Sequence, residues 1–234
     1  GRTVDMCGRY ASTPRDGDIL REFPVASVVD EQEPAPSWNV APTDSARVVL
    51  ERIVGELPDR QLRTLSWGLV PSWAKDPKMG AKLINARSET VTTKPAFKAA
   101  AAKRRCLVPA DGYYEWMVAE DGKHPMYLHG DDALAFAGLY ELRPVDDTRE
   151  QWLWTYTILT CTATDELGHI HDRSPVVVPP DLRDLWLDPT MTDPAQVRDL
   201  VASIPPPRLH TYEVATLVNS VRNNGPELVV PVTA

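Results

Sequence analysis

The sequence predicts a single α+β domain built mainly from antiparallel strands. The 234 residues fit one large domain or two small ones, and no internal repeat or long linker divides the chain. Hydrophobic residues make up 43% of the chain, which is enough for a buried core. The 22 prolines are nearly twice the usual share of about 5%, so they favour loops and short strands over a helical bundle.

The first half of the chain contains most of the expected strand pairing. Residues 46–54 and 62–70 are apolar and predict two strands joined by a polar turn. Residues 71–83 mix proline, glycine and lysine without a period and predict a loop. The alanine-rich segment 97–105 predicts a short helix, and 106–118 predicts the strand that follows it.

The second half alternates further strands with two helices. Asp121 and Gly122 predict a tight hairpin turn. The expected strands are 124–129, 133–142, 152–163 and 208–214. A proline near the first turn predicts helices at 179–187 and 193–204.

Cysteine usage and hydropathy indicate the cellular compartment. The chain has three cysteines, Cys7, Cys106 and Cys161. This number is small and odd, which disfavours a disulfide framework. No run of 18 apolar residues predicts a membrane span, and the N-terminus lacks the pattern of a secretion signal. We therefore expect a cytoplasmic protein that does not contact a membrane.

Positive charge is concentrated in one segment of an acidic chain. Residues 75–105 carry nine Lys and Arg against two acidic residues, a net charge of +7. The whole chain carries −8, which leaves −15 for the rest. The segment is either one solvated helix face or part of a groove that attracts a polyanion such as nucleic acid.

Three polar residues interrupt the apolar pattern and are candidates for chemistry. Asn85 lies in the segment INARSE, Glu115 in DGYYEW and His171 in GHIHDRSP. Each also has a structural interpretation, because Asn85 can cap a turn, Glu115 can face solvent from a strand, and His171 can be a satisfied structural histidine. A metal site at His169 and His171 is disfavoured, because the cysteines lack ligand spacing. We expect no metal and no other cofactor.

Cys7 follows Met6 in the segment DMCGRY and suggests a reaction with aldehydes. An N-terminal cysteine carries an amine and a thiol on adjacent carbons, and the amine pKa near 8 leaves part of it neutral. The amine can form an imine with an aldehyde, and the thiol can close a thiazolidine ring on the same carbon. A carboxylate such as Glu115 would stabilise the iminium cation, and a histidine such as His171 could shuttle protons.

The sequence resembles the SRAP family, the SOS-response-associated peptidase-like proteins that shield abasic sites in single-stranded DNA. The resemblance extends nearly from end to end. The matching segments are MCGRY (6–10), WNVAPT (38–43), WGLVPSWAKD (67–76), INARSET (84–90), CLVPADGYYEW (106–116), FAGLYE (136–141), IHDRSPVVV (170–178) and VNSVRNNGPELVVPV (218–232). The resemblance implies a pseudo-barrel of antiparallel strands, short flanking helices and a basic DNA channel.

The resemblance also implies four catalytic roles. Cys7 matches the cysteine that becomes the mature N-terminus and bonds to the abasic deoxyribose. Asn85 matches the asparagine that orients this cysteine and the sugar. Glu115 matches the catalytic glutamate near the amine, and His171 matches the histidine that assists ring opening and reversal of the cross-link.

The same comparison implies a set of DNA-contacting positions. They are Arg9, Asn39, Pro42, Trp73, Arg87, Lys94 and Thr160. Trp73 would stack on a base, and Thr160 would lie near the bound sugar. Two departures affect the expected DNA path: Ala74 follows Trp73 where some relatives have a second tryptophan, and Pro95 replaces an arginine, so that Lys94 is our candidate for that phosphate contact.

Met6 lies behind five residues, so a methionine aminopeptidase could not expose Cys7 directly. We expect an SRAP domain over residues 7–234, preceded by an extension over residues 1–6 that is either a cloning remnant or a propeptide. In the second case the chain would cut the Met6–Cys7 bond itself. The expected function is covalent capture of abasic sites in single-stranded DNA by a lyase- or hydrolase-like protein.

Two other functions stay open on the sequence. One is a cysteine autoprotease or peptidase, and the other is a non-enzymatic reader of modified or single-stranded DNA. We expect a monomer whose partner is abasic single-stranded DNA, with replication-fork proteins as further candidates and a nucleoid-associated location in a bacterial cell.

Overall fold

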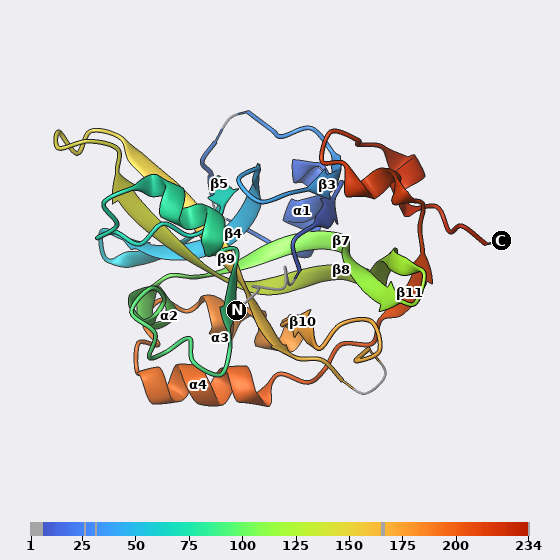
Figure 1. Cartoon of the computed structure of the whole chain (residues 1–234). Coiled ribbons are helices and arrows are strands. Elements are labelled where there is room, and N and C mark those ends of the chain that lie inside the picture. The colour runs from blue at the N-terminus through green and yellow to red at the C-terminus, as the bar shows by residue number, and fades with distance from the viewer. Residues whose placement is uncertain (1–6, 26, 31, 165–166, 234) are drawn as a thin grey trace.

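A computed structural model describes residues 7–25, 27–30, 32–164 and 167–233 (Figure 1). The predicted extension over residues 1–6, with the Met6 side of the Met6–Cys7 bond, lies outside the described residues. The described chain forms one mixed α+β domain rich in strands, as the sequence predicts.

Eleven strands and several short helices make up the described part of the domain. The strands are β1 (Tyr10–Ser12), β2 (Ser27–Val28), β3 (Ser37–Val40), β4 (Ser45–Val54), β5 (Leu57–Trp67), β6 (Asn85–Arg87), β7 (Arg105–Ala119), β8 (Gly122–Pro144), β9 (Trp152–Thr162), β10 (Arg173–Pro175) and β11 (His210–Glu213). The α-helices are α1 (Asp16–Glu22), α2 (Lys98–Lys103), α3 (Arg183–Leu187) and α4 (Pro194–Ser203). The 3₁₀ helices are η1 (Pro77–Lys82), η2 (Pro180–Leu182), η3 (Thr216–Asn219) and η4 (Pro226–Val229).

Five strands close into a barrel. The order β8-β9-β5-β4-β7 is continuous, and β7 also pairs with β8, so the sheet returns to its first strand. Every pair in this ring is antiparallel except β5 with β9, which run parallel. Strands β1 and β3 continue the sheet from β7, and β11 continues it from β8. The closed path confirms the pseudo-barrel that the family resemblance implies.

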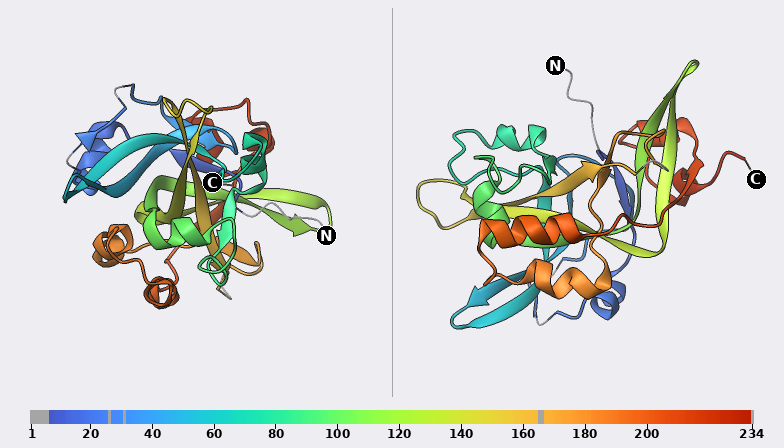
Figure 2. Two further views of the ribbon diagram at one scale, coloured as in Figure 1. Left: turned by 90° about the vertical axis from the view of Figure 1, so that its left-hand side faces the viewer. Right: turned by 90° about the horizontal axis from the view of Figure 1, so that it is seen from below.

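The sequence predicts β8 as two strands, 124–129 and 133–142, but the structure has one bent strand over Gly122–Pro144. Its pairing with β7 shifts register between Ala110 and Gly112. A Cβ at Gly112 would lie 2.5 Å from the Leu128 carbonyl oxygen, so glycine permits this close approach. The strand therefore continues through residues 130–132, between the two segments that the sequence predicts as separate strands. Figure 2 shows the β4–β5 and β7–β8 hairpins projecting beyond the barrel.

Other differences concern short elements. The expected loop over 71–83 contains the 3₁₀ helix η1, and the expected helix over 179–187 begins as η2 before continuing as α3. The strand expected over 62–70 starts earlier, at Leu57, because the hairpin turn lies at Gly55, which has a φ of 66°. Helix α1 was not predicted, and β1, β2, β3, β6 and β10 are too short to show a period.

Alternation along the barrel strands separates two cores. Side chains on one face, which include Tyr10, Trp67 and Phe136, pack inside the barrel together with Cys7. Side chains on the other face pack against residues of α2, α3 and α4, and Trp186 of α3 is completely buried there. Figure 1 shows these three helices on the same side of the barrel. Within the described ranges, no helix combines the length and apolarity needed to cross a membrane.

Candidate functional site

Pairing of β1 with β7 brings Cys7 to Glu115. Tyr10 pairs with Tyr113 in an antiparallel register, so the residues just before β1 lie against Glu115. The backbone N–H of Cys7 donates a hydrogen bond of 2.9 Å to Glu115 Oε1. Cys7 has a positive φ of 38°, a left-handed conformation that side chains rarely adopt. A strained residue held by the surrounding structure is typical of functional sites.

Burial sets the proton affinities of this pair. Cys7 is 1% exposed and Glu115 is 3% exposed. Desolvation, with a smaller contribution from the charge of Asp172, raises the pKa of Glu115 to about 8, although the hydrogen bond from Cys7 opposes the shift. Desolvation and the nearby Glu115 also raise the pKa of the Cys7 thiol well above its usual value. Glu115 can therefore give or take a proton near neutral pH, whereas the thiol stays protonated.

Aromatic side chains form the rigid support beneath Cys7. The hydroxyls of Tyr10 and Tyr156 lie 2.6 Å apart, and the ring of Tyr10 meets that of Trp67 edge-on. Trp67 in turn donates from Nε1 to the Ile84 carbonyl oxygen at 3.0 Å. This chain of contacts connects the floor below Cys7 to the segment that carries Asn85.

Asn85 begins β6, which runs parallel to β9. Its side-chain amide donates to the carbonyl oxygens of Ile84 at 3.1 Å and of Ile158 at 3.4 Å. A Cβ placed on Gly8 would lie 3.9 Å from Ile84 Cδ1, so the chain just after Cys7 passes beside this segment. Asn85 thus lies next to the Cys7 region, and its amide is held by backbone groups.

His171 lies in the turn that precedes β10. Its Nδ1 accepts the Arg173 backbone N–H at 3.1 Å and lies 3.2 Å from Asp172 Oδ1. In the tautomer that accepts the Arg173 bond, the ring proton is on Nε2. Nε2 is buried and has no partner among the described residues. The adjacent Ile170 packs in the same core cluster as Cys7, and the adjacent Asp172 acts electrostatically on Glu115. The turn therefore presents an unsatisfied donor beside the Cys7–Glu115 pair.

Arg173 fixes this turn, and sequence reasoning gave it no role. Its side chain is 6% exposed and donates two hydrogen bonds, of 2.8 and 2.9 Å, to the carboxylate of Glu89. It also donates to the carbonyl oxygen of Thr160 at 2.8 Å and to its hydroxyl at 3.2 Å. The ion pair holds the pKa of Glu89 below its usual range. The only feature of the sequence that could have indicated this role is the position of Arg173, two residues after His171.

Two residues that are predicted to contact DNA, Arg9 and Asn39, form hydrogen bonds within the protein. The Arg9 guanidinium donates to the carbonyl oxygens of Val218 at 2.6 Å and Asn219 at 3.1 Å, and to Asn39 Oδ1 at 3.1 Å. The Asn39 amide donates to three carbonyl oxygens of the 218–223 segment. These residues fasten the C-terminal segment to the strands beside Cys7, and their contact with DNA stays a prediction.

The other five predicted DNA contacts differ in exposure. Trp73 is 59% exposed, Arg87 and Lys94 are exposed, and Pro42 is half-buried. Thr160 is buried opposite Arg87 in the β6–β9 pairing. None of these positions is joined to Cys7 by a described contact, and their roles stay predictions.

The basic segment 75–105 divides between surface and interior. Arg104 forms an ion pair with Glu141, and the buried Arg105 donates to the carbonyl oxygens of Trp186 and Asp188. The remaining seven basic residues of the segment are exposed, and they are Lys75, Lys78, Lys82, Arg87, Lys94, Lys98 and Lys103. An exposed cationic surface of this kind suits a polyanion.

Metal ligation is not indicated by the described side chains, since no group of three or more His, Cys, Asp or Glu among them is placed to hold an ion. All three cysteines are free thiols. The arrangement at Cys7, Glu115 and His171 instead combines a backbone nitrogen, a thiol, a carboxyl with a pKa near neutrality and a buried ring N–H donor. These groups can support carbonyl addition with proton transfer.

Comparison with known proteins gives a consistent match. The model of the SRAP family, described as SOS response associated peptidase, matches residues 6–221. The abasic site processing protein YoqW of Bacillus subtilis is 38% identical over 227 residues, which cover 96% of this chain and 99% of that protein. The abasic site processing protein HMCES of Gallus gallus is 33% identical, covering 99% of this chain and 77% of its own length. A crystal structure of a protein from Bacteroides thetaiotaomicron shares the fold, with a TM-score of 0.78 at 21% identity, over 97% of this chain and all of that one.

Proposed function

Because the chain belongs to the SRAP family, we propose that it processes abasic sites in DNA by bonding covalently to the exposed deoxyribose through Cys7. The names of its relatives supply the substrate class. The observation that carries the proposal is the 2.9 Å hydrogen bond between the Cys7 nitrogen and Glu115, because it joins an acid–base group to the nitrogen that would become a nucleophilic amine once the Met6–Cys7 bond is cut.

The reaction begins at the nitrogen of Cys7. Once that nitrogen is a free neutral amine, it adds to the aldehyde carbon of the opened sugar, and loss of water gives an iminium ion. The thiol sulfur then adds to the same carbon and releases its proton, which closes a thiazolidine ring. No electrons are lost or gained, so the reaction needs no oxidant, and we propose that it needs no cofactor.

Glu115 would serve both steps as an acid–base group. A carboxyl with a pKa of about 8 can donate a proton to the departing water. The resulting carboxylate would stabilise the iminium cation and would accept the proton of the thiol, whose own pKa is raised by burial. Iminium formation would lower the pKa of Glu115, because an opposite charge would then replace a neutral amine.

His171 would act on the sugar oxygen. Its Nε2–H donor is buried and unpaired in the described structure, so it is available to a ligand. Donation to the ring oxygen would favour the open aldehyde over the closed hemiacetal, and the same group could return a proton during reversal. Asn85, held by two carbonyl oxygens, would orient Cys7 and the sugar.

The Cys7 amine must be liberated before this chemistry can begin. We propose that the functional domain starts at Cys7 and that the Met6–Cys7 bond is cut by the chain itself. The positive φ of Cys7 and the proximity of Glu115 support this peptidase step.

The remaining parts of the proposal concern binding. Single-stranded DNA would be guided by the exposed cations of the 75–105 segment and would stack a base on Trp73. The protein would act as a monomer in the cytoplasm, at the nucleoid, where replication-fork proteins are candidate partners.

The test uses an oligonucleotide with one uracil, treated with uracil glycosylase to create an abasic site. Protein that begins at Cys7 is expected to give an SDS-resistant band with this DNA and none with the untreated strand. The Cys7→Ala variant is expected to give no band. Efficient cross-linking by Cys7→Ala would overturn the proposal, and so would trimmed wild-type protein that leaves the lesion unbonded at neutral pH.

A further inference from the structure

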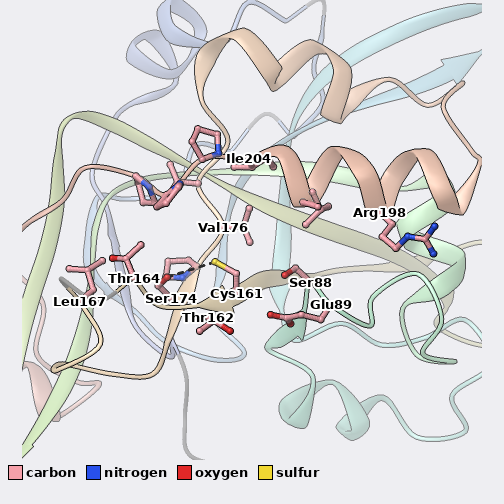
Figure 3. Close-up of a pocket in the computed structure, with 17 residues that line it drawn as sticks. Ser88, Glu89, Cys161, Thr162, Thr164, Leu167, Ser174, Val176, Arg198 and Ile204 are labelled. Atoms are coloured by element: carbon pink, nitrogen blue, oxygen red, sulfur yellow. Dashed lines mark hydrogen bonds between the residues drawn. The ribbon is translucent and has the colours of Figure 1, made fainter.

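A cavity of 310 Å³ lies between helix α4 with the prolines that follow it and the edge formed by β9 and β10 (Figure 3). Along β9, Thr160 contacts Arg173 in the network beside His171, whereas the next residue, Cys161, lines the cavity. Along β10, Ser174 likewise follows Arg173 and lines the cavity. Glu89 and Thr162, which also contact Arg173, line the cavity as well, so the cavity adjoins the Arg173 network.

The walls of the cavity are mainly apolar. Valine side chains at Val176, Val177 and Val201 line the cavity. Three consecutive prolines, Pro205 to Pro207, also line it and carry no backbone N–H donor. An apolar lining of this kind suits the faces of a flat ring, which need apolar contact and no hydrogen bonds.

Polar groups are confined to one side of the cavity. Cys161 Sγ and Ser174 Oγ lie 3.9 Å apart, and Figure 3 shows both pointing into the space below α4. The hydroxyl-bearing Ser88 and Thr162 lie on the same side. A hydroxyl can donate or accept, so this set can match the mixed donors and acceptors at the edge of a heterocycle.

Charge argues for a neutral ligand. Glu89 is the acidic residue among the described lining residues, and its carboxylate is already paired with Arg173. Arg198 is the lining cation, and it projects from α4 away from the polar side of the cavity (Figure 3). A cation would find no unpaired carboxylate inside, and a polyphosphate would find a single guanidinium.

We propose that this cavity binds a neutral heteroaromatic ring of nucleobase size. Its volume lies at the lower end of the range of roughly 300–1,000 Å³ for small-molecule pockets. The ring could belong to a free nucleoside or to an unpaired base of a DNA strand. Ser88 at the cavity directly follows the exposed Arg87, which would bring a strand to this edge. Only the strand source rests on the proposed function.

The first experiment titrates adenosine or thymidine into the full chain. The readout is the rate at which a chromogenic thiol reagent labels Cys161. Cys161 is partly exposed while Cys7 and Cys106 are buried, so it should react first, and the Cys161→Ser variant identifies its signal. We expect saturable protection with a Kd on the order of 0.1–1 mM. Ala202→Trp, which fills the cavity, should weaken binding about tenfold or more.

Two matched variants make the result specific. Gln196→Trp adds the same ring to an exposed residue of α4 outside the cavity and should bind like wild type. Ser174→Ala removes one polar group and should weaken binding about fivefold without disturbing the fold, which a thermal melt by circular dichroism checks. If neither nucleoside protects Cys161, or if benzyl alcohol, whose ring has no heteroatom, protects it as strongly as adenosine, the proposal is overturned.

The second experiment distinguishes the sources of the ring. An undamaged single-stranded oligonucleotide replaces the nucleoside in the same labelling assay. Protection by both identifies a strand base as a ligand, and protection by the nucleoside alone identifies a free ligand. Neither result depends on an abasic site, so a failure of cross-linking would leave this test unaffected.

Discussion

The backbone nitrogen of Cys7 lies 2.9 Å from Glu115 Oε1, across 108 residues of sequence. Strand β1 achieves this by pairing with β7, and the barrel core then buries both side chains. Burial raises the pKa of Glu115 to about 8 and also raises that of the Cys7 thiol. The contact therefore affects both the rate of cross-linking and the free energy of unfolding, and each of these can be measured.

Replacing Glu115 with glutamine should slow cross-linking and leave DNA affinity nearly unchanged. Glutamine keeps an oxygen that can accept the Cys7 N–H but cannot exchange a proton. We expect a loss of about 10²–10⁴ in the rate of adduct formation, the usual contribution of general acid–base catalysis. Quench-flow gel assays give the rate, and fluorescence anisotropy with undamaged single strands gives the affinity. Equal losses in both would argue against a catalytic role.

The same carboxyl should make stability depend on pH. The pKa of Glu115 is about 8 in the folded chain, compared with 4.5 for an ordinary glutamate. The carboxyl therefore contributes fully to the free energy of unfolding below pH 4.5, and this contribution is lost as the pH rises through 8. The loss amounts to at most about 5 kcal/mol. Urea unfolding between pH 5 and 9 should show wild type losing stability relative to Glu115→Gln. A constant difference between the two proteins would contradict the raised pKa.

Part of this fold and site follows from sequence because the signals are local. The hairpin turn near Gly122 and the strand that precedes it, the alanine-rich helix α2 and the proline-started α4 all show their own period or turn residues. Cys7 and Glu115 were identified together because a carboxylate near the amine would stabilise an iminium cation, and because both match catalytic residues of the family. The structure then places them in contact, which the sequence spacing alone does not require.

The remaining features depend on contacts between distant segments. Sequence alone gives no indication that the guanidinium of Arg9 is used by Val218 and Asn219, or that Arg173 joins the His171 turn to Glu89. The bend in β8 follows from the close approach of Gly112 to another strand. Each of these features depends on segments that the closed barrel brings together, so the local sequence pattern does not predict it.

Replacing His171 with alanine should slow both capture and reversal. The variant removes the buried Nε2–H donor and the Nδ1 acceptor of the Arg173 N–H. We expect a decrease of about 10² in both rates, because a proton-transfer group acts in both directions. Reversal is followed by release of pre-formed adduct into an excess of unlabelled abasic DNA. The exposed His169→Ala variant is the matched control. Unchanged capture and reversal rates in His171→Ala would remove His171 from the mechanism.

Arg87 and Arg9 should respond differently to substitution by alanine. Arg87 is exposed, so its loss should weaken binding to all sequences and reduce the salt dependence by about one counterion. Arg9 donates to two backbone carbonyl oxygens and to Asn39, so its loss should cost up to about 3 kcal/mol of unfolding free energy. Salt titrations and urea unfolding of both variants separate the two roles. A smaller salt slope in Arg9→Ala at unchanged stability would instead support direct DNA contact.

Protein that retains residues 1–6 should be unable to form the thiazolidine. In that form the nitrogen of Cys7 is an amide, which cannot add to an aldehyde, and its N–H is directed at Glu115. Intact-mass spectrometry after mixing with abasic DNA should therefore show adduct only on chains that have lost Met6 and everything before it. Incubation without DNA, for wild type and Glu115→Gln, tests whether the chain performs this cleavage itself and whether Glu115 takes part. A stable adduct on the uncleaved chain would contradict the amine mechanism, because the thiol alone would then be sufficient to hold the sugar.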